Sequence, residues 1–177
     1  MSDARLYVAS AGSCIGPLQI LERSPDHADA ALLLRAFYDE QVSRYGFADS
    51  VEFDRGQFAE PEGFFIVVYL AGVPVGCGGW RWYDRAAGVV EIKKTYLVPA
   101  ARGMGAGRAL LSRLERQALA AGAVRAILET GVLNTEALRL FVSQGYQPIE
   151  GYVPGRDPAI NRAFVRDLVT DGGPGAA

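Results

Sequence analysis

The chain has 177 residues, of which 50% are hydrophobic and 21% are charged, and its 18 basic residues against 20 acidic ones give a formal net charge of −2. This length and composition predict one globular domain over residues 1–177, and they exclude a fibrous or intrinsically disordered chain. The basic residues are scattered along the sequence without a block of like charges, so no nucleic-acid-binding surface is expected.

Cysteine usage and hydropathy favour a cytoplasmic protein. Cys14 and Cys77 lie far apart and neither begins a CxxC pair, so we expect free thiols in a reducing compartment and no metal site. The first 16 residues lack the apolar run of a signal peptide. Residues 63–80 carry no charge, but their five glycines and Pro74 indicate two strands rather than a membrane span.

The first half of the chain predicts a strand, a helix and then a run of strands. Residues 17–23 form the first strand, and Ser24-Pro25-Asp26 marks the start of a helix that continues to Tyr45-Gly46. Its apolar face is expected to contain Leu33, Leu34, Phe37, Tyr38 and Val42. An irregular segment over 47–63 leads to a hairpin of strands 64–70 and 73–83 joined at Ala71-Gly72, a turn at 84–88 and a strand over 89–98.

In the second half, strands alternate with helices. A helix that begins near Gly105 has the apolar face Leu110, Leu111, Leu114, Ala118 and Ala121, and Gly122 ends it. A strand over 124–129, a helix over 134–144 ended by Gly145, and strands over 146–152 and 161–168 follow. Residues 1–16 and 171–177 are expected to be flexible tails. This pattern predicts a mixed α/β (α+β) domain with helices on the faces of a sheet.

Residues 98–108, Val-Pro-Ala-Ala-Arg-Gly-Met-Gly-Ala-Gly-Arg, lie between a predicted strand and a predicted helix. Glycines at alternating positions permit a left-handed backbone and the close approach of a ligand. The helix that follows begins with N–H groups that have no internal partner and with the positive end of its dipole. Because Arg102 and Arg108 flank the turn with permanent charge, the segment predicts an anion site, most plausibly for a pyrophosphate.

The spacing of this turn excludes two common phosphate-binding motifs. A dinucleotide fingerprint would need a glycine where Arg108 or Leu110 stands, and a P-loop needs a Gly-Lys pair that the chain lacks. The pattern Arg102-x-x-Gly105-x-Gly107 instead resembles the acyl-CoA-binding signature of the GNAT superfamily of acetyl-CoA-dependent N-acyltransferases. Further matches follow in the family's order and spacing: residues 91–99, Leu110-Leu111, residues 128–131, Asn134, Ala137 and Gly145-Tyr146.

The resemblance implies a mostly antiparallel twisted sheet of six to seven strands with helices on both faces. It also implies that the strands on either side of the turn and its helix splay apart, and that acetyl-CoA fills the gap as acyl donor without a metal. The backbone at Leu97 and Val98 is then expected to bind the pantetheine arm and polarise the thioester carbonyl. Asn134 is expected to contact the arm. The pyrophosphate would be bound by Arg102, Gly103, Met104, Gly105, Ala106, Gly107 and Arg108.

Glu91 is the candidate catalytic base, acting directly or through a water, because it matches the common acidic position of the family on the strand before the turn. The alternative is a solvated or lysine-paired glutamate. Charges occur on both faces of the strand over 89–98, which suggests a cleft or a bulge. The family often supplies a tyrosine to protonate the departing sulfur, but Phe141 occupies that position and cannot donate a proton. Tyr146, Tyr152 or water could substitute.

The acceptor is expected to be a primary amine of a small molecule or of a protein. Tyr38, Tyr45 and residues 47–58 occupy the region where relatives form the acceptor wall. Trp80 and Trp82 could line an acceptor pocket, but aromatic residues on such a strand more often fill a core. Asp39 and Glu40 could meet an acceptor ammonium, but we favour exposed positions on a helix, as for His27. The alternative function is a non-catalytic CoA-responsive binding or regulatory module. Exposed sheet edges are compatible with a homodimer.

Overall fold

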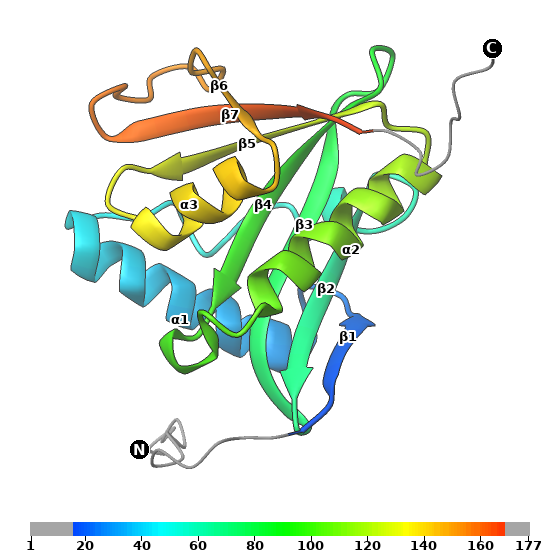
Figure 1. Ribbon diagram of the computed structural model, residues 1–177, viewed down its shortest axis with the longest axis vertical. Coiled ribbons are helices and arrows are strands. Elements are labelled where there is room, and N and C mark those ends of the chain that lie inside the picture. Colours follow the sequence, from blue (N-terminus) through cyan, green and yellow to red (C-terminus); the bar gives the residue numbers. More distant parts are fainter. Residues whose placement is uncertain (1–15, 169–177) are drawn as a thin grey trace.

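The computed structural model describes residues 16–168, which form one seven-stranded sheet in the order β1-β2-β3-β4-β5-β7-β6 (Figure 1). The strands are β1 (Leu18–Glu22), β2 (Gly63–Leu70), β3 (Val73–Asp84), β4 (Val89–Leu97), β5 (Arg125–Gly131), β6 (Gln147–Ile149) and β7 (Asn161–Asp167). Every neighbouring pair is antiparallel except β4 and β5. The predicted fold class, a mostly antiparallel sheet with helices on both faces, is confirmed.

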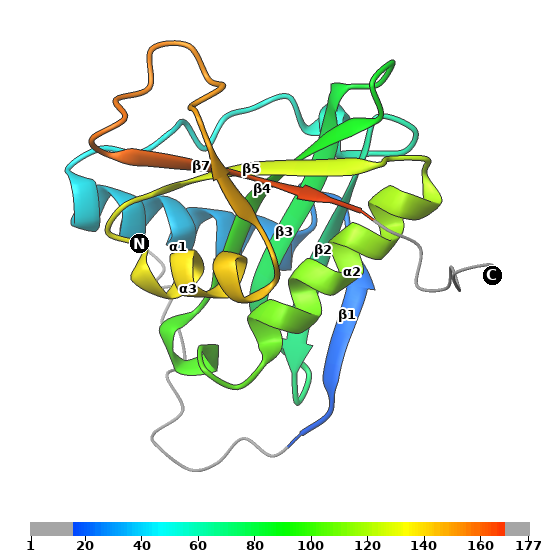
Figure 2. The same cartoon turned by 45° about the horizontal axis from the view of Figure 1, so that its top comes forward.

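Helices cover both faces of the sheet. Helix α1 (Ala28–Tyr45) lies on one face, and α2 (Ala106–Ala120) and α3 (Thr135–Ser143) lie on the other (Figure 2). The alternation of β2 explains this arrangement, because successive side chains of a strand point to opposite faces. Phe65 and Val67 pack in the cluster that contains Leu33 and Leu34 of α1, whereas the alternate residues of β2 pack against α2.

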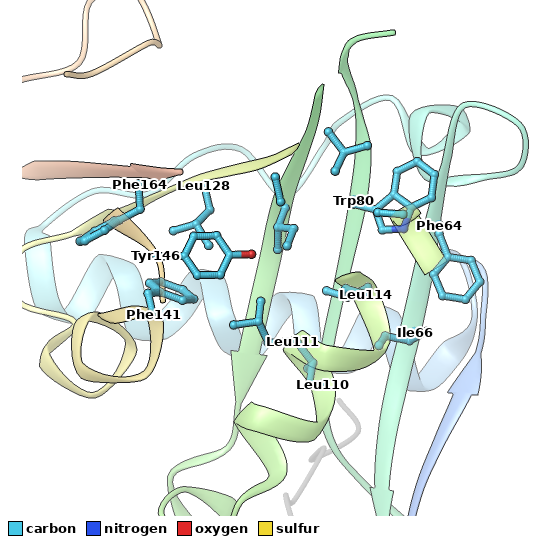
Figure 3. Close-up of a cluster of buried hydrophobic side chains, with 14 of the residues drawn as sticks. Phe64, Ile66, Trp80, Leu110, Leu111, Leu114, Leu128, Phe141, Tyr146 and Phe164 are labelled. Carbon is cyan, nitrogen blue, oxygen red and sulfur yellow. The ribbon is translucent and has the colours of Figure 1, made fainter. Parts of the chain in front are cut away.

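The larger core lies between the sheet and α2 and α3 (Figure 3). Phe141 of α3 packs against the rings of Tyr146 and Phe164, with centroids 5.9 and 6.2 Å away. Trp80 is 2% exposed and belongs to the same core, as predicted, and Trp82 packs against it. The helical face predicted for α2 is confirmed at its first four positions, Leu110, Leu111, Leu114 and Ala118, but is wrong at Ala121, which is the exposed C-cap of the helix.

The β2–β3 hairpin forms as predicted, since Ala71 and Gly72 both have positive φ, 51° and 79°, as a type I′ turn requires. Helix α1 begins later than predicted. Its N-cap is His27, whose Nδ1 accepts a hydrogen bond from the Asp29 N–H at 3.2 Å, while Ser24 and Pro25 precede the helix. Val42 is wrong as a core position, because the buried residues of α1 all lie in its first half.

The predicted strand over 146–152 is wrong in extent, because only Gln147–Ile149 pair with β7. This edge strand contains Pro148, which cannot donate to a ladder, and a loop of residues 150–160 connects it to β7. The predicted tails, apart from Gly16, and Cys14 lie outside the described residues, while Cys77 is a buried free thiol. Among the helices of residues 16–168, none is long and apolar enough to cross a membrane.

The sheet is interrupted between β4 and β5, and this interruption positions the candidate site. The parallel ladder of β4 and β5 runs from Val89 opposite Arg125 to Ile92 opposite Leu128 and ends there. Beyond this point β4 pairs only with β3, and β5 pairs only with β7. Figure 1 shows the arrows of β4 and β5 running apart. The splayed strands implied by the family resemblance are therefore present.

The core packing of α2 predicts a difference between two leucine-to-alanine variants. Leu114 is fully buried, whereas Leu32 of α1 is 43% exposed. We expect Leu114→Ala to lower the free energy of unfolding by roughly 2–5 kcal/mol because it leaves a cavity, and Leu32→Ala to lower it by less than about 1 kcal/mol. Urea denaturation monitored by circular dichroism measures both. Equal losses would contradict the packing described for α2.

Candidate functional site

A cavity of about 770 Å³ lies at the split between β4 and β5 and is lined by residues from both faces of the sheet. On the face covered by α2 and α3, its wall includes residues of the glycine-rich turn together with Ala137 and Leu140 of α3. On the opposite face, its wall includes the second half of α1 and the segment after it, among them Tyr38, Tyr45 and Phe47. The cavity therefore joins the predicted anion site to the predicted acceptor wall.

The edge of β4 presents a free backbone donor to this cavity. The Val98 N–H donates to the Val75 carbonyl of β3 at 2.9 Å, and the Val98 carbonyl accepts from the Ala101 N–H at 2.9 Å. Because bonded and non-bonded pairs alternate in an antiparallel ladder, Leu97, which stands opposite Gly76, points its backbone groups away from β3. Arg102 Nε donates to the Leu97 carbonyl at 3.0 Å. The Leu97 N–H is thus directed into the split, whereas the Val98 backbone is engaged within the protein.

The glycine-rich turn forms a cradle of N–H groups at the start of α2. Gly103 and Gly105 have φ values of 76° and 83°, and Gly105 is the N-cap of the helix. The first bond into the helix is that from the Ala109 N–H to the Gly105 carbonyl. Within residues 16–168, no acceptor takes a hydrogen bond from the N–H groups of residues 103–108. Together with the helix dipole, these free donors form a site for an anion.

The two arginines of the turn are placed differently. Arg102 Nη2 lies 2.6 Å from Glu40 Oε2, so its guanidinium binds α1 and the Leu97 carbonyl. Glu40 also receives Arg44 at 2.7 Å. Arg108 lines the cavity and has no carboxylate partner among the described residues. Arg102 therefore fixes the turn against the sheet and α1, while Arg108 is the free cation of the pair.

The exposed position predicted for Glu40 on α1 is wrong. Asp39 does occupy such a position and pairs with Arg35 at 3.1 Å. Glu40, in contrast, is only 19% exposed at its side chain and lines the cavity. The signal in the sequence was its distance of four residues from Arg44, which places both side chains on one helical face.

Of the remaining predicted binding residues, Gly107 and Asn134 line the cavity, whereas Met104 and Ala106 do not. A Cβ on Gly107 would lie 3.0 Å from Leu140 Cδ2 and 3.4 Å from Leu97 Cδ1, so glycine allows α2 to approach α3 and β4 closely. Asn134, the N-cap of α3, donates to Thr130 Oγ1 at 3.0 Å and accepts from Arg44. Met104 and Ala106 complete the turn, with Met104 58% exposed and Ala106 buried.

Glu91 lies on the cavity wall but is only 1% exposed. Its Oε2 accepts from Arg81 at 2.9 and 3.0 Å, and its Oε1 accepts from Lys93 at 2.9 Å and from the Tyr152 hydroxyl at 3.0 Å. Burial by itself would raise the pKa of Glu91, but Lys93 and Arg81 outweigh it and hold the pKa below its ordinary value. The carboxylate is therefore ionised at neutral pH and held in a fixed orientation.

A second carboxylate, Glu129 of β5, faces the same cavity and was not singled out in the sequence. Its Oε1 lies 3.2 Å from Nε of Arg156, and its buried Oε2 has no hydrogen-bond partner within the described residues. Arg156 also donates to Asp49 at 2.5 Å, so it links the segment after α1 to the loop of residues 150–160. Burial raises the pKa of Glu129, against the opposing charge of Arg156.

The tyrosine hydroxyls considered as proton donors lie outside the cavity. Phe141, at the family's tyrosine position, lines the cavity but is only 4% exposed. The Tyr146 hydroxyl lies in the core and donates to Glu115 at 2.9 Å, while Tyr152 donates to Glu91. Neither tyrosine lines the cavity. Among residues 16–168, no group of three or more His, Cys, Asp and Glu side chains is arranged to hold a metal ion.

Comparison with known proteins agrees with this geometry. Residues 30–146 match the model of the acetyltransferase (GNAT) family. A relative from Azospirillum brasilense, described as an IAA acetyltransferase, is 38% identical over 106 residues, which cover 59% of this chain and 69% of that protein.

Solved structures show the same fold. A Klebsiella pneumoniae protein assigned as an acyl-CoA N-acyltransferase superposes with a TM-score of 0.72 and 24% identity, covering 86% of this chain and 98% of that one. A Salmonella typhimurium protein assigned as an acetyltransferase and solved with acetyl-CoA gives a TM-score of 0.63 and 23% identity, covering 90% and 99%.

The contacts of Glu91 predict a pH-dependent contribution to stability. Glu91→Gln leaves Arg81 and Lys93 facing a neutral amide, so we expect a loss of roughly 1–3 kcal/mol at pH 7. Because the folded pKa lies below the ordinary value of 4.5, the stabilisation is fully present above that value and is lost as the pH falls through the folded pKa.

The measurement is urea denaturation of wild type and variant at a series of pH values from neutral to acidic. Glu150→Gln is the matched control, because Glu150 is exposed and has no ion-pair partner among the described residues. A Glu91→Gln penalty that is absent at pH 7, or that does not shrink on acidification, would contradict the network described for this carboxylate.

Proposed function

This chain belongs to the GNAT family of acetyltransferases, and we propose that it moves an acetyl group from acetyl-CoA to a primary amine by direct attack in a ternary complex. The observation that carries the proposal is the split between β4 and β5, which opens directly beside the free N–H groups of residues 103–108. The split supplies room for the extended pantetheine arm, and the N–H groups supply hydrogen-bond donors for the diphosphate.

The residues present fit acetyl-CoA as a substrate. The N–H groups of residues 103–108 would bind the diphosphate, with Arg108 adding the positive charge that has no carboxylate partner among the described residues. The Leu97 N–H, directed into the split, would donate to the thioester carbonyl oxygen. Asn134 would contact the pantetheine arm from the start of α3. Arg102 acts on binding by holding the turn in place, since its guanidinium is already bound to Glu40.

Acetyl-CoA supplies an activated acyl carbon and a thiolate leaving group. The protein must bring the amine to that carbon and remove one proton from an ammonium. The amine nitrogen then forms the new amide bond, the carbon–sulfur bond breaks, and the sulfur leaves as a thiolate that takes up a proton. Phe141 stands at the family's tyrosine position and cannot donate this proton, and Tyr146 and Tyr152 do not line the cavity. A thiol with a pKa near that of cysteine, about 8.5, is an acceptable leaving group without such help.

We assign removal of the ammonium proton to Glu91, acting through a water. Glu91 lies on the cavity wall and is ionised, but its three donors lower its affinity for a proton. Glu129 is the second candidate, favoured by its raised pKa and by the oxygen that has no partner among the described residues. The two carboxylates stand on the two strands that diverge, so both can face an amine placed in the split.

The alternative function is a CoA-responsive binding or regulatory module without turnover. The phenylalanine at position 141 favours it. The carboxylates on the cavity and the aromatic acceptor wall favour the enzyme, because a module that only binds CoA needs neither. The proposed acceptor is a primary amine of a small molecule or of a protein. We also propose that residues 1–177 form one acetyltransferase domain and that the enzyme is cytoplasmic.

The cradle predicts a selective loss of CoA affinity in Gly105→Val. Valine at φ 83° is strained and places a branched side chain beside the diphosphate. Gly122→Val is the matched control, since Gly122 has φ 97° at the other end of α2 and a Cβ added at either glycine meets no atom within 4 Å. Both variants should lose roughly 1–2 kcal/mol of stability.

Isothermal titration with CoA should then show affinity reduced at least about tenfold in Gly105→Val alone. Equal affinity of the two variants would place the diphosphate elsewhere.

Thiol release from acetyl-CoA with a panel of primary amines tests turnover. We expect the variant that removes the general base, Glu91→Gln or else Glu129→Gln, to lower kcat by about 10²-fold or more. If Glu129 is the base, activity rises with pH through its raised pKa, and Glu129→Gln removes this rise; a Glu91 base is already ionised and gives no such rise. Tight CoA binding without thiol release for any amine would favour the non-catalytic module.

A further inference from the structure

Strand β4 contains a bulge in the middle of the cavity wall. Its ladder with β3 is irregular, because Tyr96 stands opposite Cys77 and Lys93 opposite Gly79, which leaves both Lys94 and Thr95 facing Gly78. Lys94 takes the left-handed conformation, with φ 58°. This conformation costs a residue other than glycine about 1–2 kcal/mol, and such strain is concentrated at functional sites.

The bulge changes the face to which Lys94 points. Strict alternation would place Lys94 on the face of Ile92, which belongs to the core against α2. Instead, Lys94 Nζ lies 4.7 Å from the ring centroid of Phe53 in the segment after α1. The core-facing position is taken by Thr95, whose methyl group lies beside Leu110 around Gly78. Two consecutive lysines, Lys93 and Lys94, therefore lie on the acceptor side of the sheet.

Within residues 16–168, the other charged groups around Lys94 are ion-paired, whereas Lys94 is not. Lys93 binds Glu91, and Arg156 binds both Asp49 and Glu129. Within the described part of the chain, Lys94 Nζ has no hydrogen bond and no ion pair with a carboxylate. Burial lowers the pKa of Lys94. The negative charge of Asp49 raises this pKa, whereas the positive charges of Lys93 and Arg156 lower it further. A partly buried ammonium without an anion is a costly arrangement that a bound anion would relieve.

The proposed function gives this cation a role, and the inference rests on that function. We propose that the acceptor carries a carboxylate beside its reacting amine, as a free amino acid does, and that Lys94 binds this carboxylate. The amine would then lie toward Glu91 and Glu129, and the remaining group would lie against the ring of Phe53 and the aromatic wall of the cavity. Lys94 is thus a specificity-determining residue of the acceptor site.

Paired acceptors test this proposal. Thiol release is measured with the protein amino acids and with the corresponding amino-acid carboxamides, which keep the amine and lose the carboxylate. In wild type we expect kcat/KM for the carboxylates to exceed that for the carboxamides by about tenfold or more, the scale of one charge-assisted contact. In Lys94→Met this preference should disappear, mainly through KM for the carboxylates. Lys94→Arg should retain most of it.

Arg116→Met is the control for loss of a positive charge, because Arg116 lies exposed on α2 outside the cavity. A preference for carboxylates that survives in Lys94→Met, or carboxamides that are equally good substrates of wild type, would overturn the inference. So would acceptance of peptides with a free amino terminus in place of free amino acids.

A binding measurement separates this inference from the proposed function. Calorimetry of amino acids and carboxamides is carried out on the protein saturated with CoA, which requires no turnover. Binding of carboxylates that is lost in Lys94→Met, without thiol release from acetyl-CoA, would support the role of Lys94 and contradict the enzyme. Thiol release with carboxamides and amino acids alike would support the enzyme and contradict the role of Lys94.

Discussion

The end of the β4–β5 ladder at Ile92 and Leu128 determines where the cavity opens in the sheet. A continuous ladder would pair the backbone N–H and carbonyl groups of β4 with those of β5 and leave no gap between the two strands. Because the strands diverge, the Leu97 N–H has no strand partner on that side within the described residues, and the cavity reaches both faces of the sheet. The glycine-rich turn follows β4 directly, so the free N–H groups at the start of α2 are placed at the same opening.

Strand β4 concentrates the chemistry of the site because its two halves differ. Its first half is paired on both sides and holds Glu91 among Arg81, Lys93 and Tyr152, which fixes a buried charge. Its second half contains the bulge at Lys94 and the exposed edge at Leu97. Rigid pairing thus supports the carboxylate, while broken pairing opens the cavity in which we propose that acetyl-CoA and the amine bind.

The sequence predicted the elements whose signals are local. The Ala71-Gly72 turn, the apolar face of α2 up to Ala118 and the glycine-rich turn agree with the structure, because each depends on residues close together in the chain. It could not predict which partner a charged side chain meets. Glu40 binding Arg102, and Glu129 with Arg156, depend on how α1 and the loop of residues 150–160 lie over the sheet. Charges on both faces of the strand over 89–98 suggest a cleft or a bulge, but not that the bulge turns Lys94 toward Phe53 on the face covered by α1.

The proposed function depends most on the backbone amides of residues 103–108, which we propose bind the diphosphate of CoA. Backbone amide chemical shifts from nuclear magnetic resonance, recorded before and after addition of CoA, test it residue by residue. We expect the largest changes on the amides of residues 103–108 and on the amide of Leu97. Saturable binding of CoA that leaves these amides unperturbed, or no binding to the folded protein, would contradict it.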